Sequence, residues 1–390
     1  METAHRRPGT GRKAWGFGVL LAACLLAPSW RNARALEAPL FELAGKSVPA
    51  YNNAYFTYTE DKVITHHLPV RLLSNLEQAV ENGISDVFVV SIISPGDEIF
   101  YLPMINSVQE ENDAVRLTIQ CDARLFSLFS RSMPHLRFTP VKRLVRPWFA
   151  SSLSDYDRLP SSRLSSTFDN DSFQELSRHA AFIRYGNLLK STDEKRMLWE
   201  KKYLIPDPQL VERWRVFLSR YGKKKRIGIC WRTYLQIWER HPPIGISLEQ
   251  VSSLFDIPGA MFFRLQYDGL TREERNFLGR TRFANFEALD GVDQFADIEN
   301  FTALIETMDL IITPSTNPLV IAAALGKPVI QTNYEFSSFW KMEKNSMKDR
   351  YHPAIVHVLE DPPTNHPALF SKTKRLVEEF VKAGELPGLS

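Results

Sequence analysis

The sequence predicts an α/β fold with parallel sheets in two domains. Short apolar segments of strand type alternate with amphipathic segments of helical spacing along most of the chain, as in βαβ units. The segment 308–330 contains one complete unit, with a strand, a turn, a helix and a second strand. The length of 390 residues is enough for a large core and favours two domains.

Composition and charge limit the kind of partner. Apolar residues make up 44% and charged residues 24%, which is typical of a globular chain. The net charge is +3 and no aromatic-interleaved basic stripe stands out, which argues against nucleic acid as the main partner. The basic run 223–226 leads directly into a predicted strand, so we expect a solvated loop edge there. The three cysteines form no CxxC pair and no histidine motif has metal-ligand spacing, so neither a disulfide framework nor a metal site is expected.

Residues 1–35 have the pattern of a secretory signal peptide. Four cations between Arg6 and Lys13 precede an apolar run at 15–28, and an A-x-A motif follows at 33–35. The apolar run is too short for a comfortable transmembrane span. The alternatives are a disordered or mis-started leader and an interfacial anchor that associates with a membrane.

The first half of the chain, 36–200, predicts a Rossmann-like domain with a connecting loop. Residues 86–91 have the pattern of a buried strand, and a turn at 93–98 leads into a helix that begins near Ile99. The other elements expected here are helices at 71–79, 123–131 and 173–184, and strands at 116–121 and 135–138.

Asp97 is the candidate for chemistry in this half. It lies at the tip of a strand–turn–helix unit, where a carboxylate that faces a crevice can take a proton from a sugar hydroxyl. The alternative is an acid that stabilises the first turn of a helix through the helix dipole. The sequence alone leaves both interpretations open.

Residues 201–360 predict a second Rossmann-like domain, and 361–390 predict a terminal helix that packs across both halves. The apolar residues between Leu369 and Phe380 lie on one helical face. The other elements expected in this half are helices at 209–221, 248–255 and 298–307, and strands at 226–232, 260–267 and 283–286.

The turn in the segment 308–330 is the candidate for binding an anion. Ser315, Thr316 and Asn317 lie where helix caps belong, and Pro318 suits the first helical position because it lacks an N–H group. The N-terminus of a helix that follows a parallel strand is suited to a phosphate, and a nucleotide pyrophosphate is the obvious ligand. The alternative is an ordinary capped helix.

Several segments resemble a known family. The resemblance covers about residues 84–345, and the order and spacing of the segments are more specific than any one of them. It is to the glycosyltransferase domain of bacterial tetratricopeptide-repeat glycosyltransferases, which is similar to the ADP-heptose:lipopolysaccharide heptosyltransferases. The segments that carry it are 94–100 (SPGDEIF), 121–125 (CDARL), 130–134 (SRSMP), 203–208 (YLIPDP), 227–232 (IGICWR), 265–268 (LQYD) and 308–329.

This resemblance implies a GT-B fold, in which two Rossmann-like domains face each other. It implies an inverting, metal-independent transfer of a hexosyl or heptosyl group from a nucleotide-diphosphate sugar to a hydroxyl acceptor on a glycan, lipid or protein, with no further cofactor. Asp97 would be the general base. The residues implied in donor binding are Arg232, Gln266, Ser315, Thr316 and Asn317.

The sequence also departs from the family pattern. The family often has an acid in place of Ser315, a histidine in place of Val320 and a glycine in place of Ala323, and it usually has glycine or leucine in place of Pro95. The alternative function is therefore a catalytically inactive GT-B protein that binds ligands or acts as a scaffold. A dinucleotide oxidoreductase is disfavoured because no GxGxxG motif follows a predicted strand.

The expected location differs between the leader and the resemblance. Nucleotide sugars are cytosolic, so the resemblance implies a cytoplasmic protein, with membrane association if the apolar run at 15–28 acts as an anchor. A cleaved leader would instead imply export. Both locations stay open at this point.

Overall fold

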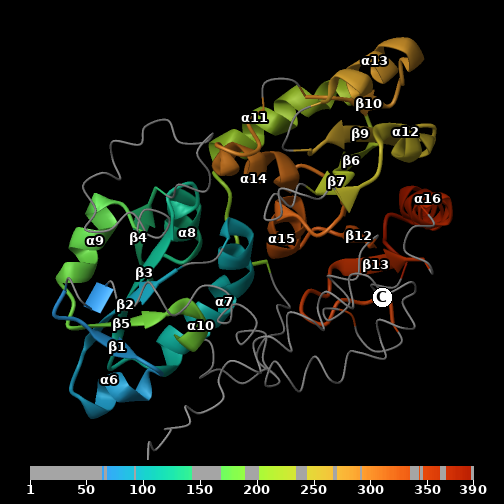
Figure 1. Cartoon of the computed structure of the whole chain (residues 1–390). Coiled ribbons are helices and arrows are strands. Elements are labelled where there is room, and N and C mark those ends of the chain that lie inside the picture. Colours follow the sequence, from blue (N-terminus) through green and yellow to red (C-terminus); the bar gives the residue numbers. More distant parts are fainter. Residues whose placement is uncertain are drawn as a thin grey trace, which may run out of the picture.

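The protein has two lobes, each built on a parallel β-sheet (Figure 1). This computed structural model describes residues 64–65, 68–91, 94–142, 168–188, 202–233, 244–266, 270–289, 292–333, 342, 346–360 and 366–387. The predicted leader 1–35, most of the predicted connecting loop, and Asp268 lie outside the described residues. The α/β class with two Rossmann-like lobes is confirmed.

The N-terminal lobe contains a five-stranded sheet in the order β1-β5-β2-β3-β4, with all pairs parallel. Apolar side chains on β2 and β3 are buried on both faces, as expected for a parallel sheet covered by helices. The elements are β1 (Arg71–Leu73), α6 (Glu77–Glu81), β2 (Asp86–Val90), α7 (Pro95–Glu111), β3 (Arg116–Asp122), α8 (Phe126–Ser132), β4 (Arg137–Val141), α9 (Asn170–Ser177), β5 (Ala181–Arg184) and α10 (Tyr185–Leu188).

Two of the helices expected in this lobe are in part strands. The segment expected as a helix at 71–79 begins with β1, and the one at 173–184 ends with β5. β5 lies between β1 and β2, and Ala181, Phe182 and Ile183 are fully buried there. Short apolar runs have no reliable periodicity, so pairing with two neighbouring strands decides their conformation.

The C-terminal lobe contains a six-stranded parallel sheet in the order β10-β9-β6-β11-β12-β13. This is the strand order of a Rossmann fold, with β6 as its first strand. Its elements are α11 (Pro208–Leu218), η4 (Ser219–Tyr221), β6 (Lys225–Ile229), β7 (Arg232–Thr233), β8 (Ile244–Gly245), α12 (Leu248–Val251), η5 (Ser252–Leu254), β9 (Ala260–Arg264), α13 (Arg272–Thr281), β10 (Phe286–Glu287), α14 (Ile298–Glu306), β11 (Leu310–Thr313), α15 (Asn317–Ala324), β12 (Val329–Asn333), β13 (Ile355–Leu359) and α16 (His366–Ala383).

The central strand β6 requires a glycine. A Cβ atom at Gly228 would overlap the side chain of Leu265 and would lie 2.7 Å from Cδ1 of Ile311. The missing side chain lets the neighbouring apolar residues close over the middle of the sheet. The carboxyl ends of β6 and β11 are thereby held side by side, which matters for the candidate site.

The terminal helix α16 belongs to the C-terminal lobe. Its buried face, with Leu369, Val377 and Phe380, packs against α12, β12 and β13 (Figure 1). The sequence predicted a helix that packs across both lobes. Within the described residues, the main contacts of α16 are instead with elements of the C-terminal lobe.

The two lobes meet through α7 and α15, which lie next to each other between the sheets (Figure 1). One continuous apolar core joins them, because it includes Ile99 and Phe100 of α7 together with Leu319 and Val320 of α15. The hydroxyl of Tyr203 also donates to the backbone oxygen of Ile99 over 3.2 Å. A shared apolar core restrains the relative motion of the lobes more than a polar contact would.

Candidate functional site

The strand order places the candidate binding residues at a topological switch point. From β6, the chain builds the sheet first in one direction, through β9 to β10, and then in the other, through β11 to β13. Ligands of open α/β sheets bind where this direction changes, outside the carboxyl ends of the strands. Arg232 follows β6 and Thr316 follows β11, and these are the two strands at the switch point.

The N-terminal lobe has a corresponding point beside β2. From β2 the chain continues to β3 and β4, and it returns on the other side of β2 to form β5. Asp97 lies in the first turn of α7, which follows β2. Both lobes therefore present their candidate residues at the equivalent place in the sheet.

The N-terminus of α15 has no acidic residue and no capping side chain. Thr316 occupies the N-cap position with extended backbone angles (φ −141°, ψ 176°), and its side chain accepts no hydrogen bond from the first turn. Its hydroxyl lies 2.9 Å from the hydroxyl of Thr313 instead. Pro318 is in the first turn, where its missing N–H is tolerated. The positive end of the helix dipole is therefore not neutralised by a carboxylate of its own first turn.

Asp97 lies in a capped turn that contacts α15. Ser94 caps α7 by accepting from the backbone N–H of Asp97 over 3.3 Å, and its hydroxyl donates to Oδ2 of Asp97 over 2.8 Å. The neighbouring Gly96 is buried against α15, where an added Cβ atom would lie 2.7 Å from Oδ1 of Asn317. The half-buried Asp97 and the half-buried Asn317 therefore lie on adjoining helical turns.

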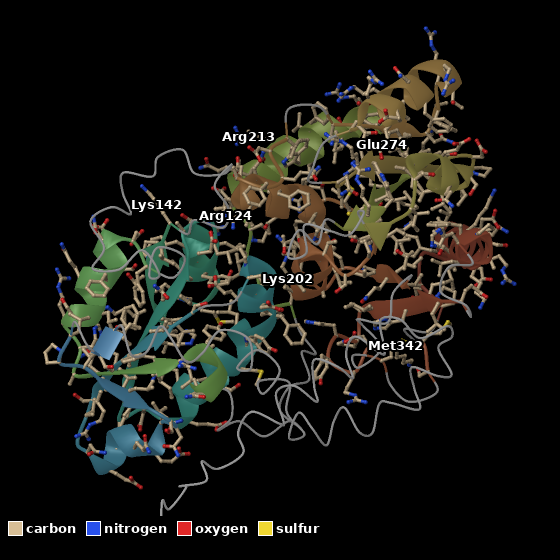
Figure 2. All side chains as sticks on the ribbon, viewed as in Figure 1. Arg124, Lys142, Lys202, Arg213, Glu274 and Met342 are labelled. Atoms are coloured by element: carbon tan, nitrogen blue, oxygen red, sulfur yellow. The ribbon has the colours of Figure 1, made fainter. Side chains whose placement is uncertain are left out.

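Arg232 is buried in an ion pair within the C-terminal lobe. Its guanidinium group contacts the carboxylate of Glu274, which also accepts from the indole N–H of Trp231 over 2.8 Å. Glu274 is labelled in Figure 2. Arg232 is 7% exposed. The structure thus places its charge beside the switch point but pairs it internally, and contact with donor phosphates stays a prediction.

Gln266 holds the turn that follows β6. Its Oε1 accepts from the backbone N–H groups of Trp231 and Arg232, both over 3.2 Å, and its Nε2 donates to the backbone oxygen of Arg232 over 3.1 Å. These bonds fix the direction of the chain where it leaves the sheet. Gln266 is 1% exposed, so it positions Arg232, and its predicted contact with a donor stays a prediction. Ser315, the remaining predicted residue, is half-buried between Thr313 and Thr316 in the chain.

Sequence reasoning missed the buried carboxylate beside Asp97. Glu98 has no exposed surface, and it accepts from the hydroxyl of Ser91 and from the backbone N–H of Asp122 over 2.8 Å. It thereby ties the first turn of α7 to the ends of β2 and β3. The available signal was its position in the first turn, but a buried acid and an exposed one look alike in a single sequence.

Arginine side chains of α8 and the preceding turn bridge the lobes. Arg124 pairs with Asp122, donates to the backbone oxygen of Phe295 over 3.1 Å, and lies 4.5 Å from the centre of the Phe295 ring (Figure 2). Arg131 forms an ion pair with Glu299 of α14. These contacts supplement the apolar core that joins the lobes.

Val320 occupies the interlobe contact. It is 8% exposed, and its Cγ2 lies 3.6 Å from the position that a Cβ atom would take at Gly96. The family that this chain resembles often has a histidine at this position, whereas this chain has an apolar side chain packed beneath α7. Valine in place of histidine favours contact between the lobes over a polar contact with a ligand.

Three further observations on the described residues concern a surface hollow, metal ligands and membrane-spanning helices. A surface hollow lined by Pro69, Val70, Asn82, Ile84 and Ala180 lies at the amino ends of the N-terminal strands, opposite the candidate site. Within the part of the chain that the structure describes, no group of three histidine, cysteine or acidic side chains is arranged to hold a metal ion. None of the helices in that same part is both long and apolar enough to span a bilayer.

Comparisons with known proteins give distant matches. No protein-family model matches the chain. The chain is 23% identical over 237 residues to Protein FlbA of Caulobacter vibrioides, and the match covers 60% of this chain but 37% of FlbA, so the chain spans little more than a third of that protein's length.

Among solved structures, it is similar to a glycosyl transferase family 9 protein from Veillonella parvula, with 13% identity, a TM-score of 0.46 and coverage of 79% of this chain and 93% of that one. It is also similar to two E. coli proteins, ADP-heptose lps heptosyltransferase II and the heptosyltransferase WaaC with ADP. Each is 13% identical with a TM-score of 0.42, covering 75% of this chain and 99% of that one.

Proposed function

We propose that this protein is an inverting glycosyltransferase that moves a sugar from a nucleotide-diphosphate donor to a hydroxyl acceptor. The observation that supports it best is the close approach of Gly96 to Asn317, with an added Cβ only 2.7 Å from Oδ1. Through that contact the turn that carries Asp97 lies next to the N-terminus of α15, whose own first turn has no carboxylate. A base beside an anion site is what this reaction requires.

In the proposed reaction, Asp97 takes the proton from the acceptor hydroxyl. At the same time, the oxygen of that hydroxyl attacks the anomeric carbon of the donor. The new C–O bond forms on the face opposite the leaving group, and the bond from the anomeric carbon to the phosphate oxygen breaks. The nucleoside diphosphate leaves with the bonding electron pair, and its charge is stabilised by the N-terminus of α15. The Ser94 hydroxyl, 2.8 Å from Oδ2, orients the carboxylate of Asp97 before the proton arrives.

Protein groups supply the positive potential in this proposal. The backbone N–H groups at the start of α15 and the Thr316 hydroxyl would contact the diphosphate, and Arg232 would contribute its charge once the diphosphate displaces Glu274 from the ion pair. We therefore propose that neither a metal ion nor a further cofactor takes part. A cytoplasmic location follows from the proposal, because nucleotide sugars are cytosolic.

The second candidate is a GT-B scaffold without turnover. The features that favour it are the apolar Val320, packed beneath α7, and the internal pairing of Arg232 with Glu274. In that case neither side chain would contribute to turnover. The two candidates differ in whether the sugar of a bound donor is transferred.

A thermal-shift titration with nucleoside diphosphates and nucleotide sugars, in the presence of EDTA, tests whether the protein binds a nucleotide without a metal ion. Ligand at about 100 times its Kd stabilises the native state by roughly 2.7 kcal/mol, so the melting temperature should rise clearly. Release of nucleoside diphosphate from a stabilising donor then tests turnover. No shift with any nucleotide would support the scaffold, and binding without turnover would do so as well.

A further inference from the structure

The outer face of α11 and the segment after it carries a group of exposed cations around exposed apolar residues. We call this the α11 face; it comprises Arg213, Val216, Phe217, Arg220, Lys223 and Lys224. Val216 is 64% exposed and Phe217 is 37% exposed. Figure 2 shows Arg213 on the outer side of α11, away from the sheet.

Helical spacing puts the first four of these residues together. Arg213 and Val216 of α11 and Arg220 of the following turn η4 are spaced by three and four residues, so Arg220 continues the stripe along the helix. The buried residues Val211 and Leu218 lie on the opposite side. The guanidinium group of Arg220 lies 3.6 Å from the centre of the Phe217 ring, so the charge and the ring form one surface.

The segment after α11 is fixed to the sheet with its lysines outward. The hydroxyl of Tyr221 donates to Glu287 over 2.9 Å, and its ring contacts that of Phe263 at 5.1 Å between centres. Lys224 lies near the turn before β10, where its Nζ donates to Oδ1 of Asn285 over 2.8 Å. The basic run predicted to be a solvated loop edge has Lys223 and Lys224 exposed in the turn between η4 and β6, next to the basic face of α11.

Acidic residues are scarce in the segment that forms the α11 face. Residues 208–224 contain five lysines and arginines but a single carboxylate, Glu212, which lies 3.6 Å from Arg215. A surface with this composition suits an anionic partner. Because apolar side chains lie exposed among the cations, the partner also needs an apolar layer that such side chains can enter.

We propose that the α11 face docks the protein on a bilayer surface that contains anionic lipids. The cations would contact the lipid headgroups, and Val216 and Phe217 would enter the boundary between headgroups and acyl chains. The face lies at the amino ends of the C-terminal strands, whereas the candidate site lies at their carboxyl ends. Docking would therefore leave the candidate site uncovered, and this proposal does not depend on the proposed function.

Lysine footprinting of the full chain with an amine-reactive reagent tests the docking. Lys223 and Lys224 should lose reactivity when vesicles of phosphatidylcholine and phosphatidylglycerol are added, and should keep it with phosphatidylcholine alone. Lys372, which lies near the carboxyl end of β13 and donates to the backbone oxygen of Leu359, is the internal control and should react equally throughout. This readout is local, so binding of vesicles by the N-terminal segment does not produce it.

Variants identify the source of any protection. The double variant Arg213→Gln/Arg220→Gln should weaken the vesicle effect by about fivefold for each cation removed. The matched variant Arg71→Gln/Arg178→Gln, which neutralises two exposed arginines of the other lobe, should not change it. Val216→Ser should weaken protection by vesicles without changing the net charge.

Unchanged reactivity of Lys223 and Lys224 with anionic vesicles would overturn the proposal. Protection by soluble polyphosphate or single-stranded nucleic acid, without protection by vesicles, would overturn it as well, because the partner would then be a soluble polyanion.

Discussion

The first turns of α7 and α15 are built alike but differ in charge. Each follows a central parallel strand at the carboxyl edge of its sheet, and each has a proline near its start. The first turn of α7 carries two acids, Asp97 and Glu98, whereas the first turn of α15 carries none. One helix dipole is therefore compensated by carboxylates of its own first turn, and the other is not.

This difference explains how two similar lobes can have different tasks. A turn with its own carboxylates repels a phosphate but can hold a proton acceptor. A neutral turn of threonine, asparagine and proline can accept phosphate oxygens at the same geometric position. The close approach at Gly96 brings the two turns together, so changes in the charge or spacing of either turn test whether they act as one site.

The largest effect is expected from removing the charge of Asp97. Asp97→Asn keeps the shape of the turn but cannot take a proton, so the rate of sugar transfer should fall by about 10² to 10⁴ fold. Binding of nucleoside diphosphate, measured by thermal shift, should be retained. Asp113→Asn, an exposed acid after the same helix, serves as the control. Equal rates for Asp97→Asn and wild type would show that the acid only stabilises the helix.

The next effect concerns a buried carboxylate of the C-terminal lobe. Asp349 accepts from the backbone N–H groups of Tyr351 and His352 and contacts Nε2 of His357, each over 2.8 Å. Burial alone would raise the pKa of Asp349, but the hydrogen bond and charge of His357, with His352, outweigh it and hold the pKa below its usual value. The buried acid of the other lobe, Glu98, is satisfied by a hydroxyl and a backbone N–H instead.

Asp349→Asn should therefore lower the free energy of unfolding at neutral pH by about 1–3 kcal/mol. Because the folded pKa of Asp349 lies below the unfolded value of about 3.9, its stabilisation is present above that pH and is lost as the pH falls through the folded value. The variant should thus lose less stability than wild type on acidification. Urea denaturation at neutral pH and in acid measures the free energy of unfolding of wild type and variant. An equal loss of stability on acidification in the two proteins would contradict a lowered pKa of Asp349.

The elements with strong local signals were predictable from the sequence. The unit from β11 to β12 combines an apolar strand, a turn with capping residues and a helix that ends before Gly326, and all these parts agree. The position of Asp97 in a strand–turn–helix unit was predictable for the same reason. In contrast, β5 could not be recognised, since its conformation depends on two partner strands distant in the sequence.

Contacts between elements that are distant in the sequence could not be predicted either. The pairing of Arg232 with Glu274, the burial of Glu98 and the contact of Gly96 with Asn317 each join residues whose proximity depends on the whole fold. A sequence shows which residues can act as acid, cation or amide. It does not show whether a neighbour from another element has already neutralised them.

A smaller effect, with opposite signs in two measurements, is expected at the N-terminus of α15. Asn317→Asp adds a carboxylate where the first turn has none, so it should repel a diphosphate and weaken nucleotide binding by about tenfold. The same charge interacts favourably with the helix dipole, so the free energy of unfolding should rise, by no more than about 1 kcal/mol. Asn276→Asp, at an exposed position of α13, is the matched control. Weaker binding in both variants would indicate a general effect of charge rather than an anion site.

The smallest effect is expected from Gly96→Ala, which tests the spacing of the two turns. The added Cβ would lie 2.7 Å from Oδ1 of Asn317, but that oxygen ends a flexible side chain and can turn away. The free energy of unfolding should therefore fall by about 1 kcal/mol, with a several-fold loss of transfer rate. Gly279→Ala, where an added Cβ meets no atom within 4 Å inside α13, should instead stabilise the helix by about 0.5–1 kcal/mol.

A double-mutant cycle shows whether the cost arises at this contact. In the Asn317→Ala background the obstructing oxygen is absent, so Gly96→Ala should become nearly neutral in stability, and the two changes should not be additive. If the two free-energy changes add, Gly96 and Asn317 do not touch in solution. The acidic turn and the neutral turn would then be separate features of two lobes rather than halves of one site.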